Sequence, residues 1–280
     1  MTEPSPEPLG LIAGSGRFPV LFAEEARRQG QRVVAVALKG VTDLPALREA
    51  ADEVSAFTLG QVNGPLDFLK KAGVKRAVMA GKVQHVSLFG GIVPDLRAVK
   101  ILAGLKDRRT DTILSAVADE FKKEGIELLS SATFLSHLLP AAGVLTKRTP
   151  TPAEEADAAL GWKAAKALAG CDAGQSAVVQ GKVVVALEAM EGTDACVRRA
   201  AELVRSNGDG PKLVVVKVAK PAQDFRFDLP VIGLDTLSVF KECGVTALAL
   251  EAGKTMIFDR AMFVRGADSN GLAVWAREDA

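Results

Sequence analysis

Cysteine and histidine are scarce in this sequence. Among 280 residues there are three cysteines, widely spaced and without a Cys-x-x-Cys pair, and only two histidines. A disulfide framework and a structural zinc site both need more of these residues at closer spacing. The sequence therefore excludes disulfide-stapled domains and zinc modules, and it favours a protein of a reducing compartment, which we expect to be the cytoplasm.

Long apolar runs and a surplus of one charge are also missing. No apolar run approaches the roughly 18 residues of a membrane-spanning helix. Residues 1–8 lack the basic and apolar regions of a secretory signal, and we expect them to form a flexible arm. The 35 lysines and arginines nearly balance 34 aspartates and glutamates, giving a net charge of +1. This balance excludes a global basic field, so we predict no nucleic-acid partner.

Two familiar catalytic motifs do not occur. The sequence contains neither the Gly-x-x-x-x-Gly-Lys-Ser/Thr loop of ATP hydrolases nor the Gly-x-Ser-x-Gly elbow of serine hydrolases. Their absence argues against both reactions.

What the sequence does contain is an alternation of apolar runs and helical patterns. Five short apolar runs with helical segments between them fill residues 9–140, a pattern typical of a parallel sheet covered on both faces. In residues 153–280, two apolar runs joined at Gly181 predict a β-hairpin and hence a mixed sheet. Between these regions lies a stretch rich in proline and short polar residues, which predicts a linker over 141–152. The predicted fold class is α/β, with an N-terminal Rossmann-like parallel-sheet domain and a C-terminal mixed-sheet α/β domain joined by a proline-rich hinge.

A glycine loop, Gly14-Ser15-Gly16, follows the first predicted strand and precedes the first predicted helix. Backbone N–H groups at such a helix start can hold an anionic group. The dinucleotide fingerprint is incomplete because Pro19 occupies the third glycine position. Lys82 follows the fourth predicted strand, so it belongs to the same edge of the sheet. We predict that this loop and Lys82 bind substrate; the alternative is a tight turn that merely needs small residues.

The densest group of charged residues follows the predicted strand 212–218. It comprises Lys217, Lys220, Gln223, Asp224, Arg226 and Asp228. Hydrolysis of a phosphoric anhydride needs cations against the developing charge, a carboxylate that holds Mg²⁺ and a positioned water, and this loop can supply all three. A self-neutralising surface loop is the alternative, although Phe225 and Phe227 would draw the loop inward.

Acidic residues also stand at two other strand ends. Glu188 and Glu191 surround a turn that leads into a helix beginning near Thr193 and Asp194, and Glu251 follows another predicted strand. Carboxylates beside the positive end of a helix can hold a divalent metal and a phosphate together. A helix capped by Thr193 or Asp194 is the simpler alternative.

Six motifs in this order resemble the LpxI-type UDP-2,3-diacylglucosamine pyrophosphatases over nearly the whole chain. They are Gly10-Leu-Ile-Ala-Gly-Ser-Gly-Arg-Phe-Pro19, Ala80-Gly-Lys82, Pro150-Thr-Pro-Ala-Glu-Glu-Ala-Asp157, Glu188-Ala-Met-Glu-Gly-Thr-Asp194, Lys220-Pro-Ala-Gln-Asp-Phe-Arg-Phe-Asp-Leu-Pro230 and Glu251-Ala-Gly253. Two departures are mild: Phe18 stands where the family has leucine, and Ala222 stands where it has glycine.

The resemblance implies a two-domain cytoplasmic enzyme of lipid A biosynthesis. Such an enzyme splits UDP-2,3-diacylglucosamine, a lipid-linked sugar nucleotide, into UMP and 2,3-diacylglucosamine 1-phosphate (lipid X) with Mg²⁺. Peripheral contact with the inner membrane and a homo-oligomer are both compatible with it. Two other functions stay open: a non-catalytic nucleotide- or lipid-binding protein, and a sugar-nucleotide transferase.

Residue roles follow as hypotheses. We expect catalysis by Asp224 or Asp228 together with Lys220, with Asp224, Glu191, Asp194 and Glu251 as metal ligands. The expected substrate-binding residues are Gly14, Ser15, Gly16, Lys82, Lys217, Gln223, Arg226 and Thr193.

Overall fold

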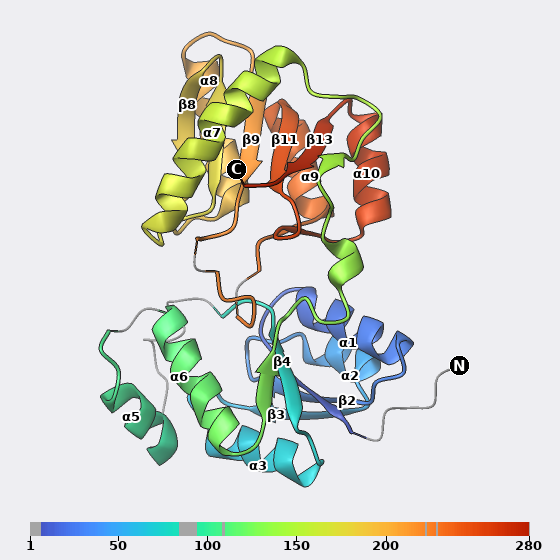
Figure 1. Cartoon of the computed structure of the whole chain (residues 1–280), viewed down its shortest axis with the longest axis vertical. Helices are drawn as coiled ribbons and strands as arrows, with labels where there is room; N and C mark the ends of the chain where they lie inside the picture. The colour runs from blue at the N-terminus through green and yellow to red at the C-terminus, as the bar shows by residue number, and fades with distance from the viewer. Residues whose placement is uncertain (1–6, 84–93, 108–109, 222, 228, 280) are drawn as a thin grey trace. The chain divides into compact units, whose positions relative to one another are not determined.

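The chain folds into two compact units (Figure 1). The computed structural model describes residues 7–83, 94–107, 110–221, 223–227 and 229–279. The first unit comprises Met1–Ser136 together with Asp224–Asp228, and the second comprises His137–Gln223 and Leu229–Ala280. A short piece of the C-terminal half of the sequence is thus part of the first unit.

The first unit is built on a parallel sheet. Its strands are β1 (Leu9–Ala13), β2 (Val33–Leu38), β3 (Glu53–Phe57), β4 (Arg76–Ala80) and β5 (Glu127–Leu129), in the order β3-β2-β1-β4-β5. All neighbouring pairs are parallel. The strand order reverses between β1 and β4, and ligands of open parallel sheets bind at such a switch point, outside the carboxyl ends of the strands. The glycine loop after β1 and Lys82 after β4 stand at this point.

Helices cover both faces of this sheet, which confirms the predicted Rossmann-like arrangement (Figure 1). They are α1 (Phe18–Arg28), α2 (Leu44–Ala50), α3 (Asn63–Lys71), α5 (Leu96–Ala103) and α6 (Thr110–Lys123). Five of the six residues of β2 are buried, as expected for a strand covered on both sides.

The second unit contains a mixed sheet, also as predicted. Its strands are β6 (Gly143–Val144), β7 (Ser176–Gln180), β8 (Val183–Leu187), β9 (Leu213–Lys217), β11 (Val245–Glu251) and β13 (Ala273–Arg277), in the order β6-β13-β11-β9-β7-β8. Strands β9, β11 and β13 are parallel, whereas the β7–β8 hairpin and β6 run antiparallel to their neighbours. A separate two-stranded sheet joins β10 (Val231–Ile232) to β12 (Met256–Ile257).

Alternate residues of this sheet pack against different helices. Val215, Leu248 and Val274 join the core formed with α8 (Thr193–Ser206), α9 (Leu234–Cys243) and α10 (Arg260–Ser269). Their neighbours in the strands pack instead against α7 (Pro152–Gly170) on the other face (Figure 1). In the part of the chain that the structure describes, no helix is long and apolar enough to cross a membrane.

The proline-rich stretch is fixed within the second unit. Gly143–Val144 forms the edge strand β6, and the division between the units falls earlier, at Ser136/His137. The Arg148 guanidinium donates to Gly271 O over 2.6 Å, to Thr246 O, and in a fork to both oxygens of Glu154 at 2.8 and 2.9 Å. These bonds hold a segment that was expected to be a linker against the ends of two strands.

Helix α7 begins with a side-chain cap. Thr151 is its N-cap, and the Glu154 side chain accepts from Thr151 N–H over 2.9 Å while Thr151 Oγ1 accepts from Glu154 N–H over 3.3 Å. This reciprocal pair is a capping box, which satisfies two N–H groups that would otherwise have no helical partner.

Candidate functional site

The glycine loop and Lys82 contact each other in the first unit. Ser15 N–H donates to Lys82 O over 2.8 Å, and Lys82 N–H donates to Ser15 O over 3.1 Å. A Cβ on Gly14 would lie 2.7 Å from Lys82 O, and one on Gly81, whose φ is +94°, would lie 2.7 Å from Ser15 O. The close approach of two backbones therefore accounts for the small residues at these positions.

This bridge limits how the loop can bind an anion. The amides of Gly14 and Ser15 donate to Ala80 O and Lys82 O, so a ligand would have to compete for them. Gly16 differs, because its φ is +85° and nothing lies within 4 Å of the position of a Cβ. Gly16 and the exposed side chain of Lys82 are the parts of this loop pair that face open space.

Residues 224–227 pack on the first unit through the Phe227 side chain and the Phe225 backbone. Phe225 O accepts from Ser131 N–H over 2.7 Å and from Ser131 Oγ over 2.8 Å, and Phe227 packs against the core of that unit. Phe227 therefore lies inward, as expected. Asp228 lies outside the described residues.

Asp224 is paired with Arg226 two residues later. The guanidinium Nε and a terminal nitrogen donate to the two carboxylate oxygens at 2.9 and 2.7 Å, and the Arg226 guanidinium carbon lies 4.8 Å from the centre of the Phe227 ring. The hydrogen bond from Arg226 lowers the pKa of Asp224 below its usual value. A carboxylate with a lowered pKa is a weak base, so this residue suits orientation of water better than proton abstraction.

Lys217 lies at the buried end of β9, inside a cluster of polar side chains. It is 6% exposed, and its ammonium donates to Thr193 Oγ1 over 2.7 Å. Ser176 Oγ lies 3.5 Å from the same nitrogen and Glu188 Oε2 lies 3.9 Å from it. Thr193 Oγ1 in turn donates to the Glu188 carboxylate over 3.2 Å. The structure thus brings together the predicted residues Lys217 and Thr193.

Ser176 is a member of this cluster that the sequence did not reveal. It pairs directly with Lys217 across β7 and β9. Residues opposite each other on neighbouring strands point to the same face. Only the register of β7 with β9 places Ser176 beside Lys217. In the sequence, Ser176 is merely a serine at the start of an apolar run.

Glu251 lies on the other face of the same sheet. Leu250, not Glu251, pairs with Lys217, and successive side chains of a strand alternate between faces. The Glu251 side chain is fully buried and accepts from Ala219 N–H over 2.7 Å, from Lys166 Nζ over 2.8 Å and from Lys254 Nζ over 2.7 Å. Glu251 is therefore separated from the Lys217 cluster and anchors the backbone from which the Lys220 loop departs.

Lys220 and Gln223 close that loop on itself. The Gln223 side-chain oxygen accepts from Lys220 N–H over 2.8 Å, and Gln223 N–H donates to Lys220 O over 3.1 Å. Lys220 Nζ forms an ion pair with Asp172 at 2.5 Å. Gln223 thus shapes the loop, and Asp172 compensates the charge of Lys220.

Glu191 and Asp194 flank the start of α8 and differ in their partners. Glu191 accepts from Arg199 over 2.6 Å, and this bond lowers the pKa of Glu191. Asp194 Oδ1 is buried and has no hydrogen-bond partner within the described ranges. The N-cap of α8 is Gly192, with no side-chain cap, so Thr193 and Asp194 are the first residues inside the helix.

The four predicted metal ligands do not form one group. Within the described residues, no three acidic, histidine or cysteine side chains gather as a metal site. Basic side chains hold Asp224, Glu191 and Glu251, which leaves Asp194 as the member with an unpartnered oxygen. Magnesium is often held by only one or two protein carboxylates when substrate phosphates supply the rest. The residues therefore fit a metal that arrives with a phosphate ligand and do not fit a dedicated protein cage.

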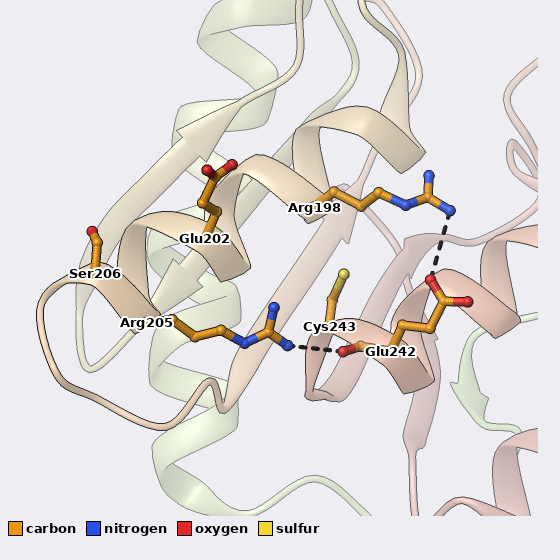
Figure 2. A pocket seen from close by; sticks show the side chains of 6 residues that line it. All are labelled: Arg198, Glu202, Arg205, Ser206, Glu242 and Cys243. Atoms are coloured by element: carbon orange, nitrogen blue, oxygen red, sulfur yellow. Dashed lines mark hydrogen bonds and ion pairs between the residues drawn. The ribbon is translucent and has the colours of Figure 1, made fainter.

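A hollow of about 620 Å³ lies between α8 and α9. Figure 2 shows its lining: Arg198, Glu202, Arg205, Ser206, Glu242 and Cys243. Arg205 donates to Glu242 O over 2.9 Å, and Arg198 lies 3.7 Å from the Glu242 carboxylate. None of the predicted site residues lines this hollow, so it belongs to the packing of two helices and not to the candidate site.

Similarity to solved structures is low. A crystal structure of the protein gox2253 aligns with a TM-score of 0.34 and 14% identity, covering 94% of this chain and 75% of its own. The ADP complex of N5-carboxyaminoimidazole ribonucleotide synthetase aligns with a TM-score of 0.26 and 13% identity, covering 72% of this chain and 45% of its own. Neither alignment is close enough to bear on function.

Similarity in sequence is much higher. The family model described as the LpxI N-terminal domain matches residues 8–138, and the one described as the LpxI C-terminal domain matches residues 141–275. A relative from Caulobacter vibrioides, named UDP-2,3-diacylglucosamine pyrophosphatase LpxI, is 33% identical over 272 residues, which cover 95% of this chain and 96% of that protein. Both domains in the same order, together with this identity, show that the chain belongs to the LpxI family.

Proposed function

We propose that this protein hydrolyses the diphosphate bond of UDP-2,3-diacylglucosamine, releasing UMP and 2,3-diacylglucosamine 1-phosphate, and that it does so in the cytoplasm during lipid A biosynthesis. The observation that carries the proposal is the similarity, over 95% of the chain, to a relative named for this activity. The geometry of the Lys217 cluster and of Asp224 supports it.

We assign phosphate binding in the second unit to Lys217 and Thr193. The Lys217 ammonium has three protons, yet it makes one short bond, to Thr193, and two longer contacts. Thr193 opens the 14-residue helix α8, whose N–H groups add positive potential at the same place. A buried cation with two long contacts that a stronger acceptor can replace, next to a helix start, is suited to a phosphate oxygen that gains charge as the bond breaks.

We assign the attacking water to Asp224. At rest its oxygens accept from Arg226. Once Arg226 turns toward a phosphate oxygen, the Asp224 carboxylate is released and can accept a hydrogen bond from water, orienting its lone pair toward phosphorus. The pairing at rest keeps both charges compensated until a substrate arrives.

Magnesium belongs to this proposal as a substrate-borne cofactor. When bound, it would neutralise the diphosphate charge and make its phosphorus easier to attack. Asp194, with its unpartnered oxygen, is the candidate ligand in the second unit.

The test uses purified protein with UDP-2,3-diacylglucosamine in detergent micelles, with Mg²⁺ or with EDTA. We expect UMP and lipid X in equal amounts without any acceptor. Asp224→Asn should lose at least about a hundredfold in turnover, the scale of a lost electrostatic or positioning group, whereas Asp67→Asn, an exposed aspartate on α3, should match the wild type.

Two outcomes would redirect the assignment. Tight substrate binding without products would indicate a binding protein, and products that form only after a sugar or lipid acceptor is added would indicate a transferase. Wild-type turnover by a folded Asp224→Asn variant would remove Asp224 from the site.

A further inference from the structure

Helix α5 carries a stripe of exposed apolar side chains. In the described part of the first unit, the large apolar side chains that are exposed are Leu96, Val99 and Leu102, at 80%, 46% and 46%, and all three belong to α5. Their spacing of three residues places them on one face of the helix. Ala98, on a different face, is buried in the core of the unit.

This helix is held in place at its N-terminal end. The Asp95 carboxylate accepts from Ala98 N–H over 2.8 Å, which caps α5, and from Val62 N–H and Asn63 N–H, each over 2.8 Å, which fixes α5 to the start of α3. Arg97 forms an ion pair with Glu124 of α6 at 2.8 Å. Two hydrogen bonds to α3 and one ion pair to α6 therefore fix the first turn of α5, from which the exposed apolar face starts at Leu96.

The position of α5 relates it to the candidate ligand edge of its unit. Asn63 begins the helix that follows β3, and helices that follow parallel strands begin at the carboxyl edge of the sheet. The Gly14-Ser15-Gly16 loop and Lys82 occupy the same edge, after β1 and β4. The apolar stripe thus belongs to a helix anchored at the edge where a parallel sheet presents its ligand loops.

Positive charge accompanies the stripe. The described residues 95–107 contain three lysines or arginines and two aspartates, a net charge of +1. Lys100, in the middle of α5, and Lys106, just beyond its end, are exposed. A helix that presents apolar side chains with lysines beside them has the composition of one that lies in the interface of an anionic bilayer.

We propose that α5 is the surface by which this protein rests on an anionic lipid bilayer. Leu96, Val99 and Leu102 enter the boundary between head groups and acyl chains, and Lys100 and Lys106 contact the acidic head groups. The inference rests on the proposed function in one respect: a diacylated substrate resides in a bilayer, and docking brings the ligand edge of the first unit to it.

The test is sedimentation of the full-length protein with vesicles in the absence of substrate. Wild-type protein should bind vesicles of phosphatidylglycerol and phosphatidylcholine, and should bind less at high salt and on phosphatidylcholine alone. Leu96→Ser/Val99→Ser/Leu102→Ser should weaken partitioning by roughly tenfold or more. Lys100→Gln and Lys106→Gln should each weaken it about fivefold.

A matched control removes three exposed apolar side chains from the second unit: Val183→Ser/Leu203→Ser/Met262→Ser, which are 62%, 43% and 52% exposed. This variant should bind vesicles as the wild type does. Circular dichroism verifies the fold of each variant, and the lysine variants keep the test valid if the apolar triple variant does not fold.

Two results with vesicles would overturn the proposal: wild-type protein that does not bind anionic vesicles, or an apolar triple variant that binds them as strongly as the wild type. A third would be a wild-type protein that is a dimer without lipid while the apolar triple variant is a monomer, since a second copy of the chain would then cover the stripe. Hydrolysis of detergent-dispersed substrate is measured separately. Protein that hydrolyses it but ignores vesicles refutes the docking surface alone, and protein that binds vesicles but hydrolyses nothing refutes the proposed function alone.

Discussion

The ion pair between Arg148 and Glu154 should make the stability of the second unit depend on pH. Burial alone would raise the pKa of Glu154, but hydrogen bonds from Arg148 and Thr151 outweigh it and lower the pKa from 4.5 to about 2. A carboxyl with this lower pKa in the folded state contributes about 3 kcal/mol to unfolding free energy at neutral pH. Because the Glu154 side chain is only 12% exposed, solvent screening removes little of this value.

Because the pKa of Glu154 is lowered in the folded state, its contribution to stability is lost on the acid side. The contribution is complete above pH 4.5, the unfolded value, and is lost as the pH falls through the folded value near 2. Glu154→Gln should therefore destabilise the protein by up to about 3 kcal/mol at pH 7 and by only about 1 kcal/mol at pH 3.

Intrinsic fluorescence measures this directly. The two tryptophans of the sequence, Trp162 in α7 and Trp275 in β13, both lie in the second unit, and there is no tyrosine. Urea titrations followed by tryptophan emission therefore report the unit that contains the ion pair. Glu155→Gln, an exposed neighbour in the same helical turn, is the control and should show a small loss that is equal at both pH values. A Glu154→Gln loss that stays constant from pH 7 to pH 3 would refute the reasoning.

Three further predictions concern packing, the loop bridge and thiol reactivity. Gly161→Ala should lower the free energy of unfolding by about 1–3 kcal/mol in urea titrations, because the added Cβ would lie 2.7 Å from a Val216 methyl. Gly170→Ala is the control and should not destabilise the protein, since nothing lies within 4 Å of its Cβ position. Equal effects of the two variants would contradict the packing. Gly81→Ala should lower the melting temperature and weaken substrate binding in calorimetry, since a φ of +94° and the contact with Ser15 O exclude a side chain; unchanged affinity would separate the bridge from the site. Burial raises the pKa of the Cys196 thiol to about 12, and Cys171 is exposed. A thiol reagent at pH 8 should therefore modify Cys171 fast and Cys196 only in denaturant, and fast labelling of both would show that Cys196 is not shielded.

Local patterns predicted the architecture well. Strand β1 follows from an apolar run of neighbouring residues. The mixed sheet follows from one hairpin, because two runs joined by a glycine turn must pair antiparallel. Features of this kind depend on neighbours in the sequence, which is why they could be predicted.

The candidate site was harder to predict because it depends on register and on distant contacts. Ser176 meets Lys217 only through the pairing of β7 with β9, and Glu251 is turned away from Lys217 by the register of β11. Asp224 was recognised as a charged loop residue, but its pairing with Arg226 and its place in the first unit depend on how Phe227 packs. No local pattern in the sequence carries that information.

The place of Phe227 in the core of the first unit has a consequence for synthesis. A chain made from its N-terminus reaches Ser136 with all five strands of the first sheet present, but the segment that completes this unit lies 88 residues further on, beginning at Asp224. The ribosome must therefore release most of the second unit before the first can be finished. An N-terminal fragment ending at Ser136 would keep an unfilled apolar site, so expression of that fragment alone should yield a less soluble product than the full chain.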